Sequence, residues 1–311
     1  MSAPERTYKV FIDGRAGTTG LRAEQRLSAR ADLTLLTLPE ELLMDENARA
    51  EMINAADVTF LCLPDDAARQ AVSFAQNPNG VIIDASTAHR TMPGWAYGFP
   101  ELGPIFYSAV RTGKRIAVPG CHASGFLALV VPLVQAGLLP KDARLTCLSL
   151  TGYSGGGQVK ITEYESDARL RSDALSAPMQ YALGQSHKHL PEMTAVAGLE
   201  HPPVFCPVIA DYYSGMEVTV PIFGADREAL LACYRAHYQG AALVRIAEPD
   251  GTPRPANCMQ GRDCMEVTVE GTDDRLLLIA RFDNLGKGAS GAAVQCLNLA
   301  IGARETEGLV L

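Results

Sequence analysis

The chain has 311 residues, of which 47% are hydrophobic and 20% are charged, and its formal net charge is −8. This composition is typical of a soluble globular protein, and the length favours two domains over one. The negative charge argues against nucleic acid or an anionic membrane as a partner, although a local field can still attract an anionic small substrate. The longest apolar run, residues 126–134, is shorter than the ~20 residues of a membrane span, and the N-terminus lacks the apolar core of a signal peptide. Eight scattered cysteines without zinc-type spacing predict a reduced, cytoplasmic protein with no metal site.

The first elements predict a dinucleotide-binding βαβ unit. Residues 8–13 form an apolar strand pattern, a glycine turn from Gly14 through Gly17 to Gly20 follows, and residues 21–29 have a helical pattern. Such glycines let backbone N–H groups approach a pyrophosphate at the helix N-terminus. The spacing G-x-x-G-x-x-G departs from G-x-G-x-x-G, so the prediction depends on the strand and helix around the turn.

Strands and helices alternate further along the chain. The expected strands are residues 33–38, 58–63, 81–84 and 115–118, and the expected helices are residues 45–55 and 65–75. Nearly continuous apolar strands separated by helices indicate a parallel sheet covered on both faces. Gly14, Pro64, Ser86 and Cys121 follow strand ends, where such sheets bind ligands, so one edge of one sheet is expected to collect them.

The pattern changes after about residue 145. Residues 145–150, 216–223, 264–270 and 275–282 are strand-like, with little helix expected between the last three, and residues 288–303 are helical again. Two of these runs alternate polar and apolar residues, as half-exposed antiparallel strands do. We therefore predict an α/β Rossmann-type nucleotide-binding domain in residues 1–120, to which a C-terminal helix at about 286–311 returns. Residues 121–285 are predicted to form an α+β catalytic and oligomerisation domain with a mainly antiparallel sheet.

Cys121 is the strongest candidate for a catalytic residue. It follows Pro119-Gly120 at the end of a strand and starts a long apolar helix pattern. Unpaired N–H groups at a helix N-terminus favour an anion, and thiolate is the nucleophilic form of cysteine. A lone cysteine is more often a small buried apolar residue, so the surrounding motifs must decide.

Seven segments in order carry a family resemblance. They are Asp13-Gly-Arg-Ala-Gly-Thr-Thr-Gly20, Asp84-Ala-Ser-Thr-Ala-His-Arg90, Tyr97-Gly-Phe-Pro-Glu101, Pro119-Gly-Cys121-His-Ala-Ser, Gly152-Tyr-Ser-Gly-Gly-Gly157, His187-Lys-His189-Leu-Pro-Glu192 and Asp283-Asn-Leu-Gly-Lys-Gly-Ala-Ser-Gly291. Together they span nearly the whole chain and resemble the N-acetyl-gamma-glutamyl-phosphate reductases, in the shorter of that family's two types.

The resemblance implies NADPH-dependent reduction of N-acetyl-L-glutamyl 5-phosphate to N-acetyl-L-glutamate 5-semialdehyde, a step of arginine biosynthesis. Cys121 would displace phosphate and hold the acyl group as a thioester, which divides one hard step into two easier ones. His189 would transfer protons, as histidine suits near neutral pH. His187 is its nearest rival, and His122 adjoins the nucleophile. In a helix, residues two apart face different ways, so only one of His187 and His189 is then expected in the site.

The resemblance also implies binding residues. For substrate they are Arg90, Ser154 and Glu192; a guanidinium suits phosphate, and the glycines after Ser154 could form a cradle of backbone amides. For cofactor they are Gly14, Arg15, Gly17, Thr18, Gly20, Ser86 and Asn284. Gln158 stands where relatives carry a basic residue, for which Lys160 could substitute. Glu40 and Glu41 would permit an NAD-type ribose contact, and Arg15 could instead face a 2′-phosphate; the family implies NADP(H). The resemblance further implies a small-molecule acyl-phosphate substrate and a homodimer or homotetramer.

Other functions stay open from the sequence. Aspartate-semialdehyde dehydrogenase shares the architecture and the Cys–His chemistry, and an aminoadipyl-phosphate reductase of lysine synthesis is also possible. A catalytically inactive NADPH-binding protein would not need Cys121, His189 and Arg90 together. A Cys–His hydrolase would leave the dinucleotide turn without a role.

Overall fold

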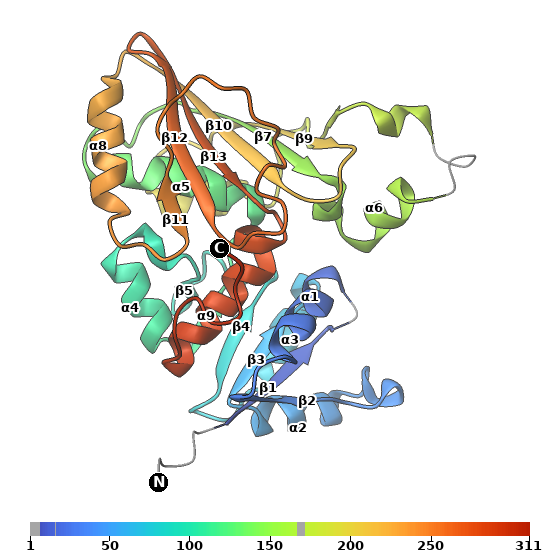
Figure 1. Ribbon diagram of the computed structural model, residues 1–311. Helices are drawn as coiled ribbons and strands as arrows, with labels where there is room; N and C mark the ends of the chain where they lie inside the picture. The colour runs from blue at the N-terminus through green and yellow to red at the C-terminus, as the bar shows by residue number, and fades with distance from the viewer. Residues whose placement is uncertain (1–6, 16, 167–171) are drawn as a thin grey trace. The chain divides into compact units, whose positions relative to one another are not determined.

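The structure, a computed structural model, describes residues 7–15, 17–166 and 172–311 (Figure 1). The chain divides into two compact units. Unit 1 consists of residues 1–100, 105–119 and 290–309, and unit 2 consists of residues 101–104, 120–289 and 310–311. Each unit is therefore built from three separate stretches of sequence.

Unit 1 contains a six-stranded sheet with the order β2-β1-β3-β4-β6-β5, and every neighbouring pair is parallel. The strands are β1 (Tyr8–Asp13), β2 (Leu33–Leu36), β3 (Val58–Leu61), β4 (Val81–Asp84), β5 (Ala96–Tyr97) and β6 (Arg115–Ala117). The sheet confirms the Rossmann-type prediction. The expected strands 33–38 and 58–63 end early, because the pairing with their neighbours stops at Leu36 and Leu61.

Helices cover both faces of this sheet, as the alternation of side chains along a strand requires. Val10 and Ile12 of β1 point into a core shared with the first, fourth and ninth helices, whereas Phe11 points into a core shared with the second and third. These helices are α1 (Thr18–Leu27), α2 (Glu46–Ala55), α3 (Asp65–Ser73), α4 (Pro104–Thr112) and α9 (Gly291–Ile301). The red helix α9 lies beside β4 in Figure 1, and the two elements are in contact.

Unit 2 contains a seven-stranded mixed sheet with the order β11-β12-β13-β10-β7-β9-β8. Two pairs, β11 with β12 and β7 with β9, are parallel, and the other four are antiparallel. The strands are β7 (Thr146–Gly152), β8 (Met179–Gln180), β9 (Val204–Ala210), β10 (Met216–Phe223), β11 (Val244–Ile246), β12 (Met265–Thr272) and β13 (Arg275–Phe282). The prediction of a mainly antiparallel sheet is confirmed.

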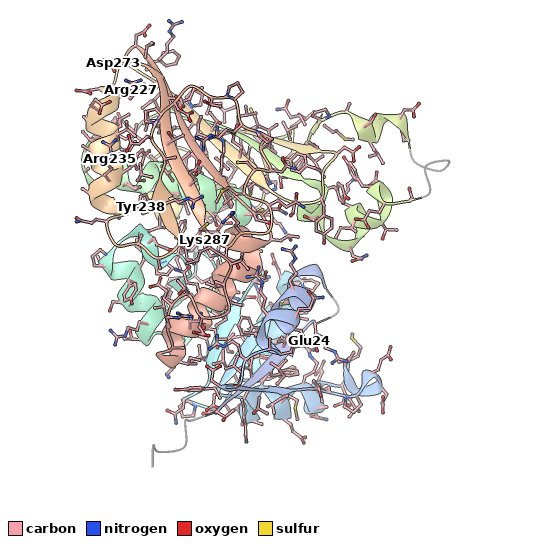
Figure 2. All side chains as sticks on the ribbon, in the orientation of Figure 1. Glu24, Arg227, Arg235, Tyr238, Asp273 and Lys287 are labelled. Atoms are coloured by element: carbon pink, nitrogen blue, oxygen red, sulfur yellow. The ribbon has the colours of Figure 1, made fainter. Side chains whose placement is uncertain are left out.

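The central helix of unit 2 is α5 (Cys121–Gln135), whose residues 122–133 are all buried. It packs against β10 and β13 and against α7 (Leu190–Ala197) and α8 (Arg227–His237). The hydroxyls of Tyr234 and Tyr238 on α8 donate to the α5 carbonyls of Leu129 and Ala128, at 2.6 and 2.7 Å (Tyr238 is labelled in Figure 2). The remaining helix is α6 (Gly157–Tyr164).

The expectation of little helix between the strands 216–223 and 264–270 is wrong. Helix α8 lies between them, and its N-cap is Asp226, whose side chain accepts from the backbone N–H groups of Glu228 and Ala229. An aspartate in this position is a standard start signal for a helix. This signal was not used in the prediction, because strand-like patterns lie on either side of it.

Within the described part of the chain, no helix is both long enough and apolar enough to cross a membrane.

Candidate active site

Cys121 is the first residue of α5, with Gly120 in extended conformation as the N-cap. Its side chain is partly exposed, whereas Cys147 is buried and burial raises the pKa of that thiol. Burial likewise raises the pKa of Cys62 to about 12. Because free N–H groups at a helix start stabilise an anion, Cys121 has the setting of a nucleophile, which these two other cysteines lack.

A tight turn lies directly against Cys121. Residues Gly286–Ser290 form a single π-helical turn, and a Cβ added to Gly288 would lie 2.9 Å from the Cβ of Cys121. Lys287 in this turn is buried, and its Nζ lies 2.7 and 2.8 Å from the two carboxylate oxygens of buried Glu101 (Figure 2 labels Lys287). Single π-helical turns are frequent at functional sites, and this one fixes the space behind the thiol.

Three histidines lie next to one another, and one of them, His122, directly follows Cys121 in the sequence. The ring centroid of His122 is 5.5 Å from those of both His187 and His189, which are 4.6 Å apart. Residues 187–189 form a turn, and α7 begins only at Leu190. The expectation that only one of His187 and His189 enters the site applied to a helical segment, and this segment is a turn, in which both rings lie beside that of His122.

His122 is held in its neutral form. Its Nδ1 lies 2.7 Å from the hydroxyl of Ser149, and its Nε2 lies 2.7 Å from that of Tyr181. Burial, and then the neighbouring His187, lower the pKa of His122 to about 3. A ring with that pKa is unprotonated at neutral pH and has little tendency to accept a proton, so His122 is unsuited to acid–base catalysis.

Glu192 connects the helix start with His189. Its side chain is 1% exposed; one oxygen accepts from the backbone N–H of Gly120 at 3.1 Å, and the other lies 4.0 Å from Nε2 of His189. His187 is occupied differently, because its Nδ1 accepts from the backbone N–H of His189 at 3.1 Å. The carboxylate of Glu192 therefore adjoins both the residue before the nucleophile and the predicted proton-transfer group.

Tyr181 is a site residue that sequence reasoning missed. Its hydroxyl is within hydrogen-bond distance of His122, and its pKa is raised by burial and, to a smaller extent, by Cys121. The loop after it is fixed by Gln185, whose side-chain amide donates to and accepts from the backbone of Phe205, at 2.7 and 2.8 Å. Ala182 and Gln185 in this loop have positive φ, a strained backbone conformation that the sequence does not reveal.

The predicted residues Ser154 and Asn284 are hydrogen-bonded to each other. Asn284 donates to the Ser154 hydroxyl at 3.0 Å and accepts from the backbone N–H of Gly215 at 2.8 Å, and both side chains are buried. Lys160, the expected substitute for a missing basic residue, donates at 2.6 Å to Glu163 on the same helix. The glycines after Ser154 lead through a 3-10 turn into α6, so the backbone amides of the predicted cradle lie at a helix start.

The glycine turn of unit 1 joins β1 to α1. A Cβ on Gly14, whose φ is +84°, would lie 2.4 Å from the carbonyl oxygen of Cys62, and one on Gly20 would lie 2.6 Å from that of Gly14. Only glycine fits both positions, and Gly17 is the N-cap of α1. The predicted Thr18 is the first residue of α1, but its side chain lies outside the described part of the structure. The turn has the close backbone approach that a dinucleotide pyrophosphate requires.

Beneath this turn, Asp13 at the end of β1 forms a buried ion pair with Arg49 of α2, at 2.9 Å. At the end of β4, the carboxylate of Asp84 accepts from the Ser86 hydroxyl at 2.7 Å and lies 2.6 Å from Nδ1 of His89. Ser86, the predicted cofactor contact, therefore lies at the carboxyl edge of the sheet.

Arg90, the predicted phosphate ligand, is anchored on backbone carbonyls. Its Nε donates to Val118 at 2.9 Å and one Nη donates to Ala85 at 3.2 Å. Val118 is three residues before Cys121 in the sequence. These two hydrogen bonds hold the side chain at the strand ends.

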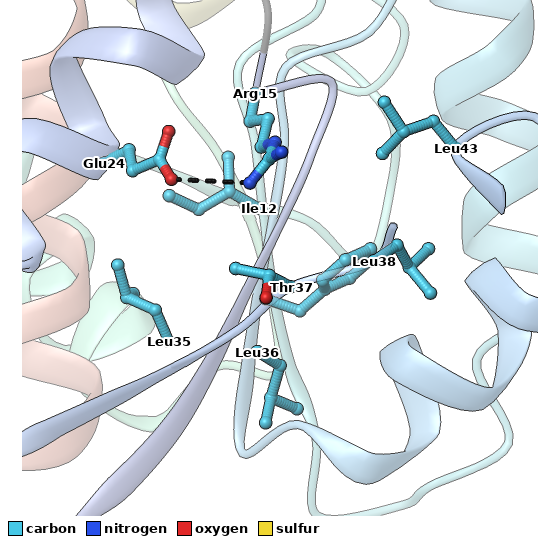
Figure 3. Close-up of a pocket in the computed structure, with 9 residues that line it drawn as sticks. Ile12, Arg15, Glu24, Leu35, Leu36, Thr37, Leu38 and Leu43 are labelled. Carbon is cyan, nitrogen blue, oxygen red and sulfur yellow. Dashed lines mark ion pairs between the residues drawn. The ribbon is translucent and has the colours of Figure 1, made fainter. Parts of the chain in front are cut away.

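A pocket opens beside the glycine turn (Figure 3). Apolar residues of β1 and β2 form its walls, and Arg15 and Glu24 are its charged residues, with Nη1 of Arg15 3.7 Å from Oε1 of Glu24. Glu40 and Glu41 lie in an exposed 3-10 turn and do not line it. Of the groups predicted from the sequence, Arg15 is thus the one that this pocket contains.

Across residues 7–15, 17–166 and 172–311, no three His, Cys, Asp or Glu side chains gather as a metal would require.

Sequence models of two domain families match the chain. Residues 14–106 match the semialdehyde dehydrogenase NAD binding domain, and residues 121–284 match the semialdehyde dehydrogenase dimerisation domain. Among solved structures, aspartate semialdehyde dehydrogenase II of Vibrio cholerae has a TM-score of 0.73 at 16% identity, covering 96% of this chain and 99% of that one. The Candida albicans aspartate semialdehyde dehydrogenase with NADP has a TM-score of 0.67 at 16% identity, covering 94% and 98%. At such identities the likeness concerns the fold.

Curated relatives are much closer in sequence. An N-acetyl-gamma-glutamyl-phosphate reductase 2 of Pseudomonas putida is 43% identical, over 97% of this chain and 99% of the relative. An N-acetyl-gamma-glutamyl-phosphate reductase of Burkholderia ambifaria is 44% identical, over 94% and 96%. An N-acetyl-gamma-glutamyl-phosphate reductase 2 of Nostoc sp. is 42% identical, over 97% and 99%.

Proposed function

The chain belongs to the N-acetyl-gamma-glutamyl-phosphate reductase family, and on that premise we propose how its residues carry out the reaction. The enzyme reduces N-acetyl-L-glutamyl 5-phosphate to N-acetyl-L-glutamate 5-semialdehyde and releases phosphate, as a step of arginine biosynthesis. The observation that carries the mechanism is the position of Cys121 at the start of α5, beside the pair formed by His189 and Glu192.

The cofactor is NADP(H), and unit 1 has residues that fit it. The glycine turn, in which no Cβ has room at Gly14 or Gly20, and the N-terminus of α1 would hold the pyrophosphate. Arg15 would face the ribose phosphate, while Thr18, Ser86 and Asn284 stay as predicted contacts. When bound, the nicotinamide supplies the hydride.

In the first step, His189 accepts the thiol proton and the sulfur of Cys121 attacks the acyl carbon. A C–S bond forms, the bond from that carbon to the phosphate oxygen breaks, and inorganic phosphate leaves. We assign Arg90 to the phosphate, because it is held at the strand ends and a guanidinium suits phosphate in charge and shape. Ser154 and Glu192 stay as predicted substrate contacts, and Glu192 additionally orients His189.

In the second step, the thioester carbonyl oxygen becomes negative as hydride is added to its carbon. His189 donates its proton to that oxygen and recovers it when the C–S bond breaks, which releases the aldehyde and returns Cys121 as thiolate. His122 takes no part in proton transfer, since its pKa of about 3 keeps it neutral.

The test is a reaction without NADPH. Acyl phosphate mixed with the enzyme should release at most about one phosphate per site and leave the acyl group on the peptide that contains Cys121, as mass spectrometry would show. Cys121→Ser should give neither product while still binding NADPH. Arg90→Leu should slow phosphate release far more than the later discharge by NADPH. An enzyme that turns over but never carries the acyl group on Cys121 would overturn the mechanism.

We also propose a cytoplasmic homodimer or homotetramer. The matched dimerisation domain supports an assembly, and so does the sheet face of unit 2 that points away from α5. This face exposes Leu148, Val204, Phe223 and Leu277, and the strand register places all four on the same side. For the domains we propose residues 1–120 with about 286–311 as the NADP-binding part, and residues 121–285 as the catalytic and oligomerisation part.

A further inference from the structure

We propose that Glu24 is a counter-ion of Arg15 that competes with the 2′-phosphate of the cofactor and thereby limits how tightly the chain binds NADP(H). The proposal rests on the proposed function in one respect, because it takes NADP(H) as the cofactor. It concerns a pair of side chains within unit 1, one in the glycine turn and the other on α1.

The pocket in Figure 3 places this pair where a cofactor ribose would lie. Its walls are apolar side chains from the ends of β1 and β2, together with Leu43. In the dinucleotide-binding fold, the end of the second strand adjoins the adenosine ribose. Among the described residues that line the pocket, only Arg15 and Glu24 are charged, and a dashed line in Figure 3 joins them.

At the end of β2, where an acidic group would select NAD, the described pocket lining has none. Thr37, an exposed residue just beyond the end of β2, lines the pocket where an NAD-type site has an aspartate or glutamate. Glu40 and Glu41 belong to the exposed turn Glu40–Leu42, outside the lining. The charged group that can meet a substituent on the ribose 2′-position is therefore the guanidinium of Arg15.

The bond between Arg15 and Glu24 is weak enough to be exchanged. The nitrogen and oxygen are 3.7 Å apart, which is beyond hydrogen-bond range, and the two side chains are 36% and 32% exposed. By contrast, the pair of Asp13 and Arg49 has 2.9 Å separation and side chains only 6% and 7% exposed. Exposed ion pairs stabilise little, so a phosphate that offers two charges and a bidentate contact can replace Glu24 on Arg15.

Glu24 could act on 2′-phosphate binding with either sign. By holding Arg15 near the pocket it could pre-orient the guanidinium, which would strengthen binding. A contact of 3.7 Å without a hydrogen bond restricts Arg15 too little for that. Once phosphate has taken its place, the carboxylate remains close to a dianion and repels it. The net effect of Glu24 is therefore to weaken binding of the 2′-phosphate and to leave the rest of the nucleotide unaffected.

The experiment compares 2′,5′-ADP with 5′-ADP by titration calorimetry on the full chain, without substrate and at low salt. Glu24→Gln should lower the Kd of 2′,5′-ADP about five-fold and leave that of 5′-ADP unchanged. Arg15→Met should raise the Kd of 2′,5′-ADP more than about ten-fold, again with little change for 5′-ADP. The partly exposed Glu24 tolerates glutamine, which circular dichroism would verify.

Glu41→Gln is the matched control, because it removes the same charge near β2 without touching Arg15. It should leave both ligands as in the unmodified chain. An equal gain from Glu41→Gln would show a general charge effect and overturn the proposal, as would an unchanged or weaker affinity for 2′,5′-ADP in Glu24→Gln. The reductase assay is separate: discrimination of 2′,5′-ADP as expected, in a chain that does not reduce the acyl phosphate, would overturn the proposed function alone.

Discussion

At the scale of single residues, the three clustered histidines have different environments and therefore different chemistry. His122 has both nitrogens within hydrogen-bond distance of hydroxyl groups and a pKa lowered to about 3. His187 uses Nδ1 to accept a backbone hydrogen bond. His189 has a carboxylate oxygen 4.0 Å from its Nε2, and a carboxylate stabilises the protonated ring that proton transfer requires. The geometry therefore favours His189 as the proton-transfer group.

Among substitutions of the three histidines, replacement of His189 should therefore lower activity the most. His189→Asn is expected to lower kcat by about 10²–10⁴, the usual contribution of a positioned acid–base group. His187→Asn is the matched control, and it should lower kcat much less. Steady-state assays with both variants decide the assignment, since the opposite ranking would transfer the role to His187.

The buried neutral His122 should also make stability depend on pH. Its folded pKa of about 3 lies below the ordinary value of about 6.5, so between these values the unfolded chain binds more protons. The stabilisation is complete above pH 6.5 and is lost as the pH falls, by up to about 1.4 kcal/mol per unit. Urea unfolding at pH 7 and pH 5.5 should show this loss of unfolding free energy, and the loss should be smaller in His122→Gln. An equal loss in the variant and in the unmodified chain would contradict the assignment of the effect to His122.

The site was predicted from the sequence only as far as local motifs extend. Cys121, His189 and Arg90 lie in short segments that resemble a known family, and their roles stay predictions. The contacts of His122 with Ser149 and Tyr181 join residues far apart in the sequence, in segments whose pattern gives no sign of them. Likewise, no local pattern distinguishes a helix from a turn at residues 187–189, and this difference decides where both histidines point.

At the scale of elements, the π-helical turn Gly286–Ser290 is the part that most directly shapes the site. Gly288 lies against Cys121, and its neighbour Lys287 is held by Glu101. The backbone carbonyl of Glu101 in turn lies 3.0 Å from Nε2 of His237. Glu101 and Lys287, residues to which the sequence analysis gave no role, thus join their two matched motifs in one buried ion pair beside Cys121.

This arrangement predicts different outcomes for stability and for rate. Lys287→Met removes the cation of a buried ion pair and leaves the carboxylate of Glu101 buried, and it should cost about 3–5 kcal/mol of unfolding free energy. The double variant Lys287→Met/Glu101→Met should recover most of that stability. Its kcat should remain low, because the ion pair that places the turn against Cys121 is absent. Unfolding curves and kcat measured on the same samples test this, and recovery of both would contradict it.

Strands with a clear apolar or alternating pattern were predicted best. The six residues of β1, the four of β4 and the whole of β10 and β13 have the expected bounds, because burial on a sheet is written directly in their side chains. Strand β9 was missed: its Pro207 is a residue that strands disfavour, and its pairing partner β7 is distant in the sequence. The hydrophobic pattern of a strand predicts which of its side chains are buried, whereas its pairing with a strand distant in the sequence is seen only in the structure.

At the scale of the whole molecule, the exposed face of the seven-stranded sheet predicts how assembly can be disturbed. Leu148→Lys puts a charge on the sheet face that also carries Val204 and Leu277. If assembly buries this face, a charge without a partner there is costly. We expect dissociation towards monomer in analytical ultracentrifugation, with an unchanged circular dichroism spectrum. Met44→Lys, a control at an exposed residue of unit 1, should leave the assembly intact. A Leu148→Lys variant that keeps the native sedimentation coefficient would place the interface elsewhere.

The composition of unit 1 has a consequence for synthesis of the protein in the cell. Its core contains Val10 and Ile83 from the first third of the chain, and Ala292, Val294 and Leu297 from helix α9 near the end. At about 5–20 residues per second, a ribosome needs roughly 15–60 s to make the sequence between them. During that interval one apolar face of the first strands lacks the cover of α9 and is a ready binding surface for chaperones. The core of the nucleotide-binding unit is therefore complete only after nearly all of unit 2 has been synthesised.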